Sequence, residues 1–184
     1  MLLRRSTGSG YSKPFIYSVP GRSHCAAMLY PRRFFVVKGR GLSRTSDLLA
    51  FNNALKSAGI HQLNLVPVSS ILPPDAEEED YHPLPPGAIA FVVMSEKRAK
   101  GPAKISAGVS WARGRPHGYV PEFHDGNSSQ ETLKRLESMW QEIVEGERLD
   151  LEKPRYVVEE LEVPEGFYGS VVAALVFSKI DYYP

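Results

Sequence analysis

The spacing of apolar and polar residues predicts two amphipathic helices among several short strands. In the segment 47–58 the apolar positions recur every three or four residues, which in a helix places them on one buried face: Leu48, Phe51, Ala54, Leu55 and Ala58. Ser46 is a suitable N-cap for this helix, and Gly59 suits a left-handed C-cap. The first helix is therefore expected to begin at Asp47 and to end just before Gly59.

A second helix is expected to start at the capping-box pattern Ser128-Ser129-Gln130-Glu131 and to end near Gly146. Its apolar stripe consists of Leu133, Leu136, Trp140, Ile143 and Val144. Runs of β-forming residues predict strands at 34–37, 62–70, 88–95, 105–112, 119–123, 155–162 and 170–177. The proline-rich, acidic stretch 73–86 is expected to be a solvated loop. These elements indicate the α+β class, with mixed sheets and two main helices.

Composition limits the class of protein further. A chain of 184 residues with 42% hydrophobic residues fits one folded domain with a substantial core. The apolar run at 171–177 is too short to cross a bilayer, so no membrane partner is expected. The single cysteine, Cys25, cannot form an intramolecular disulfide, which favours a cytoplasmic location. No Cys/His cluster has the spacing of a zinc site, and no metal is expected.

The net charge of +1 conceals an uneven distribution of charge. Nine of the 22 basic residues and none of the 21 acidic residues lie in 1–46, so the rest of the chain carries a net charge of −8. Residues 1–31 are expected to form a basic, disordered extension, and residues 32–184 the functional domain. A targeting segment, an anion-binding arm or a true start at Met28 are the alternatives for the extension. The acidic body has no basic stripe, which argues against nucleic-acid binding.

The most informative stretch runs from Asn64 to Pro74, where a strand-like run ends in Ser69-Ser70 and two prolines follow. The Ser70 hydroxyl can attack the carbonyl of Ser69 and move the acyl group from nitrogen to oxygen. β-Elimination of that ester frees Ser69 as a new C-terminus, and loss of ammonia leaves a pyruvoyl group at position 70. A serine pair alone is weak evidence, because Ser128-Ser129 is an ordinary helix cap.

Other stretches strengthen this interpretation. They are 51–60, Ala76-Glu77-Glu78, Leu84-Pro85-Pro86-Gly87, Glu96-Lys97, Ile105-Ser106-Ala107, and Glu122-Phe123 with Gly126. Together with the Ser-Ser-Ile-Leu-Pro-Pro block, they resemble the pyruvoyl-dependent arginine decarboxylases over about residues 32–180. No glycine-rich phosphate cradle stands out, because Gly39-Arg40-Gly41 is only a weak pair of glycines.

The resemblance implies a four-layer α/β/β/α sandwich and a lyase that activates itself from a zymogen. Cleavage at Ser69-Ser70 would give two fragments, and the covalent pyruvoyl group from Ser70 would form a Schiff base with the substrate. The implied reaction is decarboxylation of L-arginine to agmatine, a step of polyamine biosynthesis. The cleaved αβ units would assemble into homo-trimers, with active sites between neighbouring subunits.

The resemblance also implies roles for individual residues. Glu122 corresponds to a general acid that protonates the α-carbon, a task that needs a raised pKa. Asn64 corresponds to an asparagine used in self-processing and in the active site, where its amide could donate to an oxyanion. Without the resemblance, Asn64 is a polar edge-strand residue and Glu122 a surface glutamate at a strand end. The remaining substrate-binding candidates are Asn52, Val68 and Ile71; Glu78 and Glu96 are weaker pocket carboxylates.

Asn52 departs from the family pattern, in which an aspartate contacts the guanidinium group of the substrate. An amide can accept a hydrogen bond, but it lacks the charge-assisted, bidentate pairing of a carboxylate. Two alternatives therefore stay open: a decarboxylase of a different amino acid, and an unprocessed, non-catalytic paralogue. A serine hydrolase ranks last, because the chain has no Gly-x-Ser-x-Gly elbow.

Overall fold

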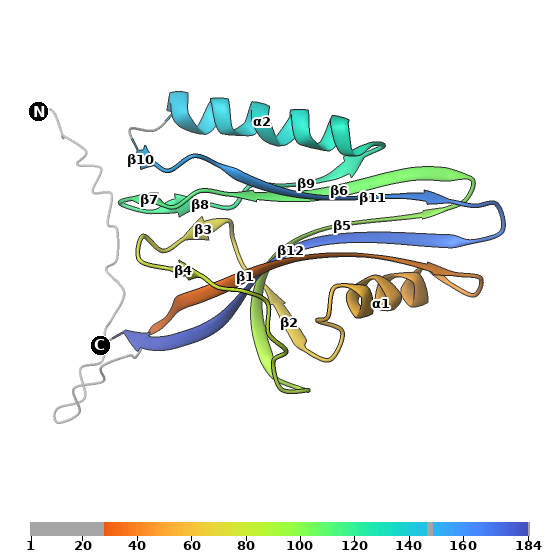
Figure 1. Ribbon diagram of the computed structural model, residues 1–184, viewed down its shortest axis with the longest axis horizontal. Coiled ribbons are helices and arrows are strands. Elements are labelled where there is room, and N and C mark those ends of the chain that lie inside the picture. The colour runs from red at the N-terminus through yellow and green to blue at the C-terminus, as the bar shows by residue number, and fades with distance from the viewer. Residues whose placement is uncertain (1–27, 147–148, 184) are drawn as a thin grey trace, which may run out of the picture.

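The computed structural model describes residues 28–146 and 149–183. Figure 1 shows four layers, in which a helix covers the outer face of each of two stacked sheets. The expected α+β class and its two main helices are confirmed. Residues 1–27 of the expected basic extension lie outside the described residues, so their disorder is not tested, whereas residues 28–31 form the start of a strand.

The larger sheet has five strands in the order β2-β5-β12-β1-β4. The pairs β2–β5 and β1–β4 are parallel and the other two are antiparallel, so this sheet is mixed, as expected. Its strands are β1 (Met28–Ser43), β2 (Asn64–Pro67), β4 (Glu77–Glu78), β5 (Ile89–Lys100) and β12 (Tyr168–Tyr183).

The second layer is an antiparallel sheet in the order β11-β6-β9. Its strands are β6 (Ala103–Trp111), β9 (Glu122–Gly126) and β11 (Arg155–Val163). Two short pairs lie beside the main sheets: β3 (Ile71–Leu72) with β8 (Gly118–Tyr119), and β7 (Gly114–Arg115) with β10 (Asp150–Leu151).

Helix α1 (Asp47–Ser57) packs on the larger sheet and begins and ends where local signals predict. The Ser46 hydroxyl accepts a hydrogen bond from the backbone N–H of Leu49 at 3.2 Å, which caps the first turn. Gly59 has φ of 77°, the left-handed conformation that glycine adopts most readily. The expected burial of Leu48 is wrong, because this side chain is 65% exposed.

Helix α2 (Ser129–Gly146) packs on the smaller sheet. The Ser128 hydroxyl accepts from the Glu131 N–H at 3.2 Å, while the Glu131 carboxylate accepts from the Asn127 N–H at 3.0 Å. The expected capping box is therefore present, except that the Glu131 carboxylate binds the N–H of Asn127 and not that of Ser128. Leu136 and Trp140 are buried as predicted, whereas Val144 is 60% exposed.

Strand β12 lies at the centre of the core and is buried on both faces. Val172, Ala174 and Val176 pack with Ala54 and Ala58 of the α1 side. Leu175 and Phe177 point the other way and pack between the two sheets, where Leu72 and Val120 are also fully buried. The same side-chain alternation that defines a strand thus joins two layers of the core.

Gly39 and Gly41 are explained by packing of α1 on β1. A Cβ at Gly39 would collide with the backbone of Ala54, and one at Gly41 with the backbone of Ala50. The two glycines lie on the same face of β1 and allow the helix backbone to approach the sheet closely. They therefore have a structural role that the sequence pattern did not indicate.

Gly41→Ala is expected to lower the free energy of unfolding by about 1–3 kcal/mol, the usual range for overpacking. The added methyl group meets helix backbone, which cannot move as a flexible side chain can. Chemical denaturation measures the change, and Gly146→Ala is a control because nothing lies within 4 Å of a Cβ there. Equal stability of Gly41→Ala and the unaltered protein would contradict this account.

Several expected boundaries are corrected by long-range pairing. The first strand is much longer than 34–37 because β1 pairs with β12 along its length. The expected strand 62–70 ends at Pro67, and the expected strand 119–123 is divided between β8 and β9. The loop 73–86 contains β4, which pairs with β1 and leaves Glu78 only partly exposed. That segment is therefore not fully solvated.

Candidate active site

Ser69 and Ser70 lie where the chain crosses from one sheet towards the other. Pairing with β5 continues to Val68, whose N–H donates to the carbonyl of Val92 at 3.0 Å. Pairing with β8 starts at Ile71, which lies opposite Tyr119. The Ser69–Ser70 peptide bond therefore joins two segments that are anchored to different partners.

The backbone on either side of this bond is fixed by two hydrogen bonds. The carbonyl of Ser69 accepts from the N–H of Ile71 at 2.9 Å, and the carbonyl of Ser70 accepts from the N–H of Val120 at 2.9 Å. An N–H directed at the Ser69 oxygen is an oxyanion donor for any attack on that carbonyl carbon. No described non-glycine residue has a positive φ, so the step shows no strain of that kind.

The Ser70 hydroxyl donates to Oε2 of Glu122 at 2.9 Å. The two residues are far apart in sequence, and β9 carries Glu122 to Ser70. Burial raises the pKa of Glu122, whereas the hydrogen bond from Ser70 and the nearby His124 oppose that shift. The carboxyl can thus accept a proton from the hydroxyl when ionised and donate one when protonated.

An apolar groove opens beside the serines. It has a volume of about 430 Å³ and is lined by Leu29, Pro31, Val68, Ser69, Ile71, Pro73, Phe91, Phe177 and Ile180. The structure thus brings Val68 and Ile71 together on the two sides of the Ser69–Ser70 step. Both are partly open to solvent, at 36% and 44% exposure.

Asn64 and Asn52 are not joined to the Ser70–Glu122 pair. The side-chain amide of Asn64 donates to the carbonyl of Gly87 at 2.8 Å, on the edge strand β2. Asn52 lies in α1, which packs against β1, β12 and β5. Among the described residues, no hydrogen bond or ion pair connects either asparagine to Ser70.

The two weaker carboxylate candidates are engaged in other contacts. Glu78 accepts from the indole N–H of Trp111 at 2.7 Å and pairs with Arg155. Glu96 accepts two hydrogen bonds from Arg98, at 2.8 and 3.0 Å. Neither contact involves Ser70, so these carboxylates have structural partners of their own.

Sequence reasoning did not find the backbone donors at Ile71 and Val120, or the influence of His124. Backbone groups carry no sequence signal of their own. His124 could have been recognised from its spacing, because alternate residues of one strand share a face and it lies two positions after Glu122.

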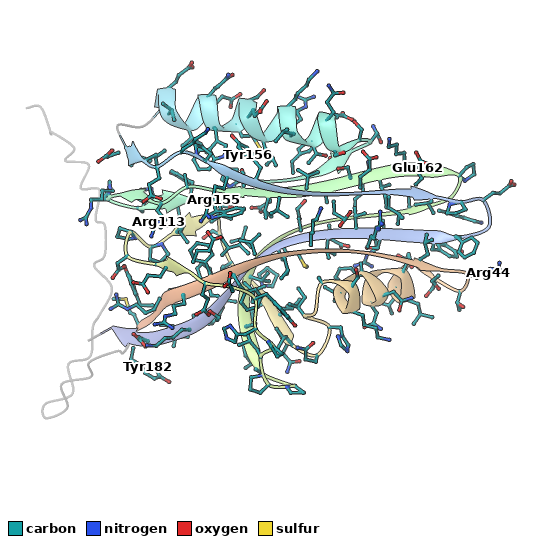
Figure 2. All side chains as sticks on the ribbon, viewed as in Figure 1. Arg44, Arg113, Arg155, Tyr156, Glu162 and Tyr182 are labelled. Atoms are coloured by element: carbon teal, nitrogen blue, oxygen red, sulfur yellow. The ribbon has the colours of Figure 1, made fainter. Side chains whose placement is uncertain are left out.

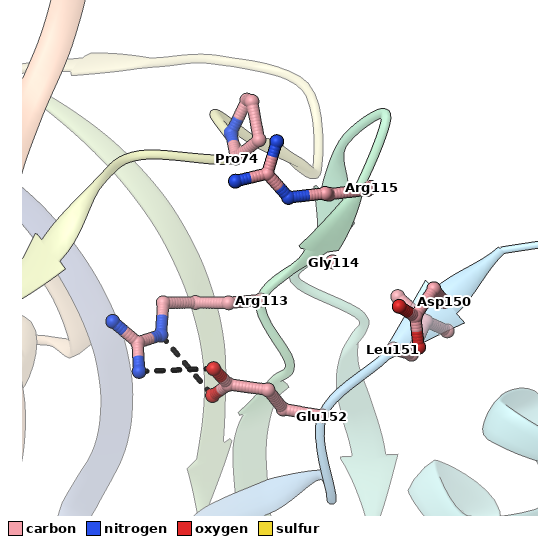
Figure 3. A pocket seen from close by; sticks show the side chains of 7 residues that line it. All are labelled: Pro74, Arg113, Gly114, Arg115, Asp150, Leu151 and Glu152. Carbon is pink, nitrogen blue, oxygen red and sulfur yellow. Dashed lines mark hydrogen bonds and ion pairs between the residues drawn. The ribbon is translucent and has the colours of Figure 1, made fainter.

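A separate pocket of about 260 Å³ lies beside β7 and β10. Figure 3 shows Arg115 extending towards Pro74, while Arg113 makes a bidentate ion pair with Glu152 at 3.0 and 3.1 Å. Arg113 and Arg155 lie in the same half of the sandwich, away from Arg44 (Figure 2). The lining of this pocket contains no serine, so it cannot supply the nucleophile.

Two further features of the described residues bear on function. Neither described helix has the length and apolar composition needed to cross a membrane. Within 28–146 and 149–183, no group of three or more His, Cys, Asp and Glu side chains has the arrangement of a metal site.

The residues at the step fit a pyruvoyl group made from Ser70. The Ser70 hydroxyl, the Ser69 carbonyl that it would attack and the Ile71 N–H that would stabilise the oxyanion lie on consecutive residues. The Glu122 carboxyl lies opposite them and accepts from the hydroxyl. In that group the Cα of Ser70 would become the keto carbon and its Cβ the methyl group, and Glu122 would be the carboxyl beside this residue. Fold and site together define a class: α+β sandwiches with a serine–carboxyl pair at a crossing between sheets.

Comparison with known proteins identifies the family. The family described as "Pyruvoyl-dependent arginine decarboxylase" matches residues 33–181. A protein of that name from Methanopyrus kandleri is 36% identical over 150 residues, which cover 80% of this chain and 97% of the relative. The chain belongs to the pyruvoyl-dependent arginine decarboxylase family. The predicted family, its enzyme class and its covalent pyruvoyl cofactor are confirmed at the level of the family.

Two other relatives show how the similarity is distributed. "Pyruvoyl-dependent arginine decarboxylase 1" from Methanosarcina acetivorans is 42% identical over 104 residues, covering 52% of this chain and 62% of the relative. A pyruvoyl-dependent arginine decarboxylase from Methanocella arvoryzae is 33% identical over 166 residues, covering 81% and 96%. The chain therefore spans less than two thirds of the first of these relatives and nearly all of the second.

Proposed function

We propose that this chain cleaves itself at Ser69-Ser70 and then decarboxylates L-arginine to agmatine and carbon dioxide. The observation that carries the proposal is the 2.9 Å hydrogen bond from the Ser70 hydroxyl to Glu122, at the serine pair of a family member. We assign the decarboxylase domain to residues 32–184 and the extension to 1–31, of which residues 28–31 join the domain through their pairing with β12. The single cysteine supports a cytoplasmic location, and the acidic body favours neither nucleic acid nor a membrane as partner.

Cleavage would start when Glu122 takes the hydroxyl proton of Ser70. The Ser70 oxygen attacks the carbonyl carbon of Ser69, the C–N bond breaks, and the proton passes to the released amine. The N–H of Ile71 already donates to the Ser69 oxygen, where negative charge develops. We assign Asn64 a further role in processing or catalysis, which requires its amide to leave the carbonyl of Gly87.

The ester then breaks by β-elimination. Ser70 loses its α-hydrogen, its Cβ–Oγ bond breaks, and Ser69 leaves as a carboxylate. The resulting dehydroalanine tautomerises to an imine, and water replaces the imine nitrogen, which leaves as ammonia. Because β2 holds one new end and β3 the other, the fold keeps both fragments in place after the bond is broken.

In turnover, the pyruvoyl carbonyl supplies the electron sink that decarboxylation needs. Glu122 then acts in its protonated form and delivers a proton to the substrate α-carbon. Its raised pKa supports this role, because a glutamate with an ordinary pKa is almost fully ionised near neutral pH. Val68 and Ile71 contact the aliphatic part of the substrate in the apolar groove that they line.

We further propose a homo-trimer of cleaved αβ units. Large apolar side chains are exposed near the serines, on the edge strand β2 and at the start of β5: Leu29, Val66, Val68, Ile71 and Ile89. Among the described residues, Asn52 and Asn64 have no hydrogen bond to Ser70 in their own subunit, which suits a site completed by a neighbour. A monomer by light scattering, in protein that still decarboxylates arginine, would contradict the trimer.

Intact-mass spectrometry combined with carbon dioxide release tests the main proposal. The purified protein should give two masses, for residues 1–69 and for 70–184 with a pyruvoyl N-terminus, and should release carbon dioxide from arginine. One unmodified mass of the 184-residue chain in active material would refute the mechanism. Borohydride should reduce the carbonyl of the second fragment and abolish activity.

Asn52→Asp is expected to lower KM for arginine about tenfold, because a carboxylate binds guanidinium about 1.4 kcal/mol more strongly than an amide does. The measurement is steady-state carbon dioxide release with arginine and with uncharged amino acids of similar length. Improvement for arginine alone supports a guanidinium contact at position 52. No change in KM would place this contact elsewhere in the chain.

Asn52 also favours a second candidate, a decarboxylase of another amino acid. This candidate shares the cleavage chemistry and differs only in the group that the pocket recognises. Carbon dioxide release across the common amino acids separates the two. An unprocessed paralogue would show neither cleavage nor release with any of them.

A further inference from the structure

We propose that Ser95 and Ser110 are positioning residues that hold Glu122 against Ser70, and that Trp140 orients Ser110. The proposal rests on the function proposed above and concerns how the reacting carboxyl is kept in place. Glu122 lies on β9, a short strand at the edge of the smaller sheet. Such a strand needs additional contacts if its side chain is to keep a fixed position.

Ser110 fixes the peptide group that precedes Glu122. Its hydroxyl donates to the carbonyl of Pro121 at 3.3 Å, and its backbone N–H donates to the same oxygen at 2.8 Å. The indole N–H of Trp140, on α2, donates to the Ser110 hydroxyl at 2.9 Å. Ser110 is fully buried and Trp140 is 4% exposed, so both are held in place by the core.

Ser95 fixes the peptide group that follows Phe123, the next residue after Glu122. Its hydroxyl donates to the carbonyl of Phe123 at 2.7 Å from β5 of the opposite sheet. Lys97, on the same face of β5, continues this arrangement with hydrogen bonds to the carbonyls of Asp125 and Gly126 at 3.0 and 3.2 Å. Side chains of β5 therefore bind the backbone of β9 from the opposite sheet.

The two serines bind the peptide groups before and after the Glu122-Phe123 pair. Ser110 belongs to the sheet that contains β9, whereas Ser95 belongs to the sheet that carries the chain up to Ser69. They restrain Glu122 relative to both layers, and the Val120 N–H bond to Ser70 joins the same segment to the reacting turn. A displacement of about 1 Å at a reacting group can reduce a rate by about 100-fold. The restraint therefore matters both when Glu122 takes the Ser70 proton in cleavage and when it delivers a proton to the substrate in turnover.

The decisive comparison uses Ser106→Ala as a matched control. Ser106 is another fully buried serine of β6, but its hydroxyl donates to the carbonyl of Glu159 and accepts from Thr132, away from Glu122. All three serine-to-alanine changes remove one buried hydroxyl and should lower the thermal midpoint. Only Ser95→Ala and Ser110→Ala should change the behaviour of Glu122.

The first measurement is NMR titration of Glu122 in the uncleavable Ser70→Ala protein, with labelled glutamate carboxyls. Loss of either positioning serine should admit water and so lower the pKa of Glu122, with no change for Ser106→Ala. Besides Ser70, the described group that acts on this carboxyl is His124, which all the variants retain. The measurement needs no turnover, so it stands even if the chain decarboxylates no amino acid.

The second measurement is turnover in the cleavable protein. Ser95→Ala and Ser110→Ala should each lower kcat about tenfold at unchanged KM, and should move the fall of activity to lower pH. If Ser110→Ala does not fold, Trp140→Phe and Ser95→Ala test the two sides separately. Thermal midpoints that fall without any change in the Glu122 titration or in the pH profile would overturn the proposal.

Discussion

Ser70→Ala should leave one uncleaved chain and reduce decarboxylation below detection. The variant keeps the Ser69 carbonyl and its Ile71 donor but removes the oxygen that attacks and the atoms that become the pyruvoyl group. The effect is expected to be complete, because no external cofactor can replace a carbonyl that the chain makes itself. Intact-mass spectrometry and carbon dioxide release, made on the same sample, measure both losses.

Ser69→Ala is the matched control for this experiment. The Ser69 hydroxyl is not used in the proposed cleavage, whereas its carbonyl is, so this variant should still be cut before residue 70. The circular dichroism spectra of the two variants should agree, because each change removes only one hydroxyl from the same short connection between strands. Cleavage of Ser70→Ala, or full activity in its intact chain, would exclude Ser70 as the source of the electrophile.

Local signals predicted the helices better than the strands. Ser46, Gly59 and the box at Ser128 act within a few residues, and the structure bears out each of these helix boundaries. The strands depend on partners far away: β1 is long because β12 lies beside it, and β4 forms because β1 offers a free edge. Periodicity also identifies a helical face without showing how far the neighbouring sheet extends, which is why Leu48 is exposed.

The candidate site, too, depends partly on local sequence and partly on contacts between distant segments. The sequence marked Ser70 by its neighbours and Glu122 by family resemblance, but only the fold brings the hydroxyl within 2.9 Å of the carboxyl. Ser110 had a weak signal, as a polar residue between apolar ones, whereas Ser95 had none, because it opens the polar run 95–98. Their partners could not be predicted, because each hydrogen bond depends on how β9 lies between two layers.

Glu122→Gln should lower kcat about 1000-fold, within the range that general acid catalysis contributes. An amide keeps the size of the side chain and can still accept from Ser70, but it can neither take up nor deliver the proton. Cleavage of the precursor should slow as well, because the same carboxyl receives the Ser70 proton. Glu96→Gln is the control, since that carboxylate is paired with Arg98 instead.

The two roles of Glu122 predict opposite responses to pH. Cleavage needs the ionised carboxyl, so its rate should rise as pH rises through the pKa of the precursor. Turnover needs the protonated carboxyl, so kcat should fall as pH rises through the pKa of the cleaved protein. Cleavage also consumes the Ser70 hydroxyl, whose hydrogen bond lowers the pKa of Glu122, so this pKa should be higher after cleavage than before.

Separate pH profiles of cleavage and turnover test this prediction. Between the two pKa values both reactions should proceed, because the precursor is ionised there while the cleaved protein is still protonated. Both pH dependences should disappear in Glu122→Gln, which titrates in neither state. Parallel profiles for cleavage and turnover would show that a different group serves one of the two reactions, and would confine Glu122 to the other.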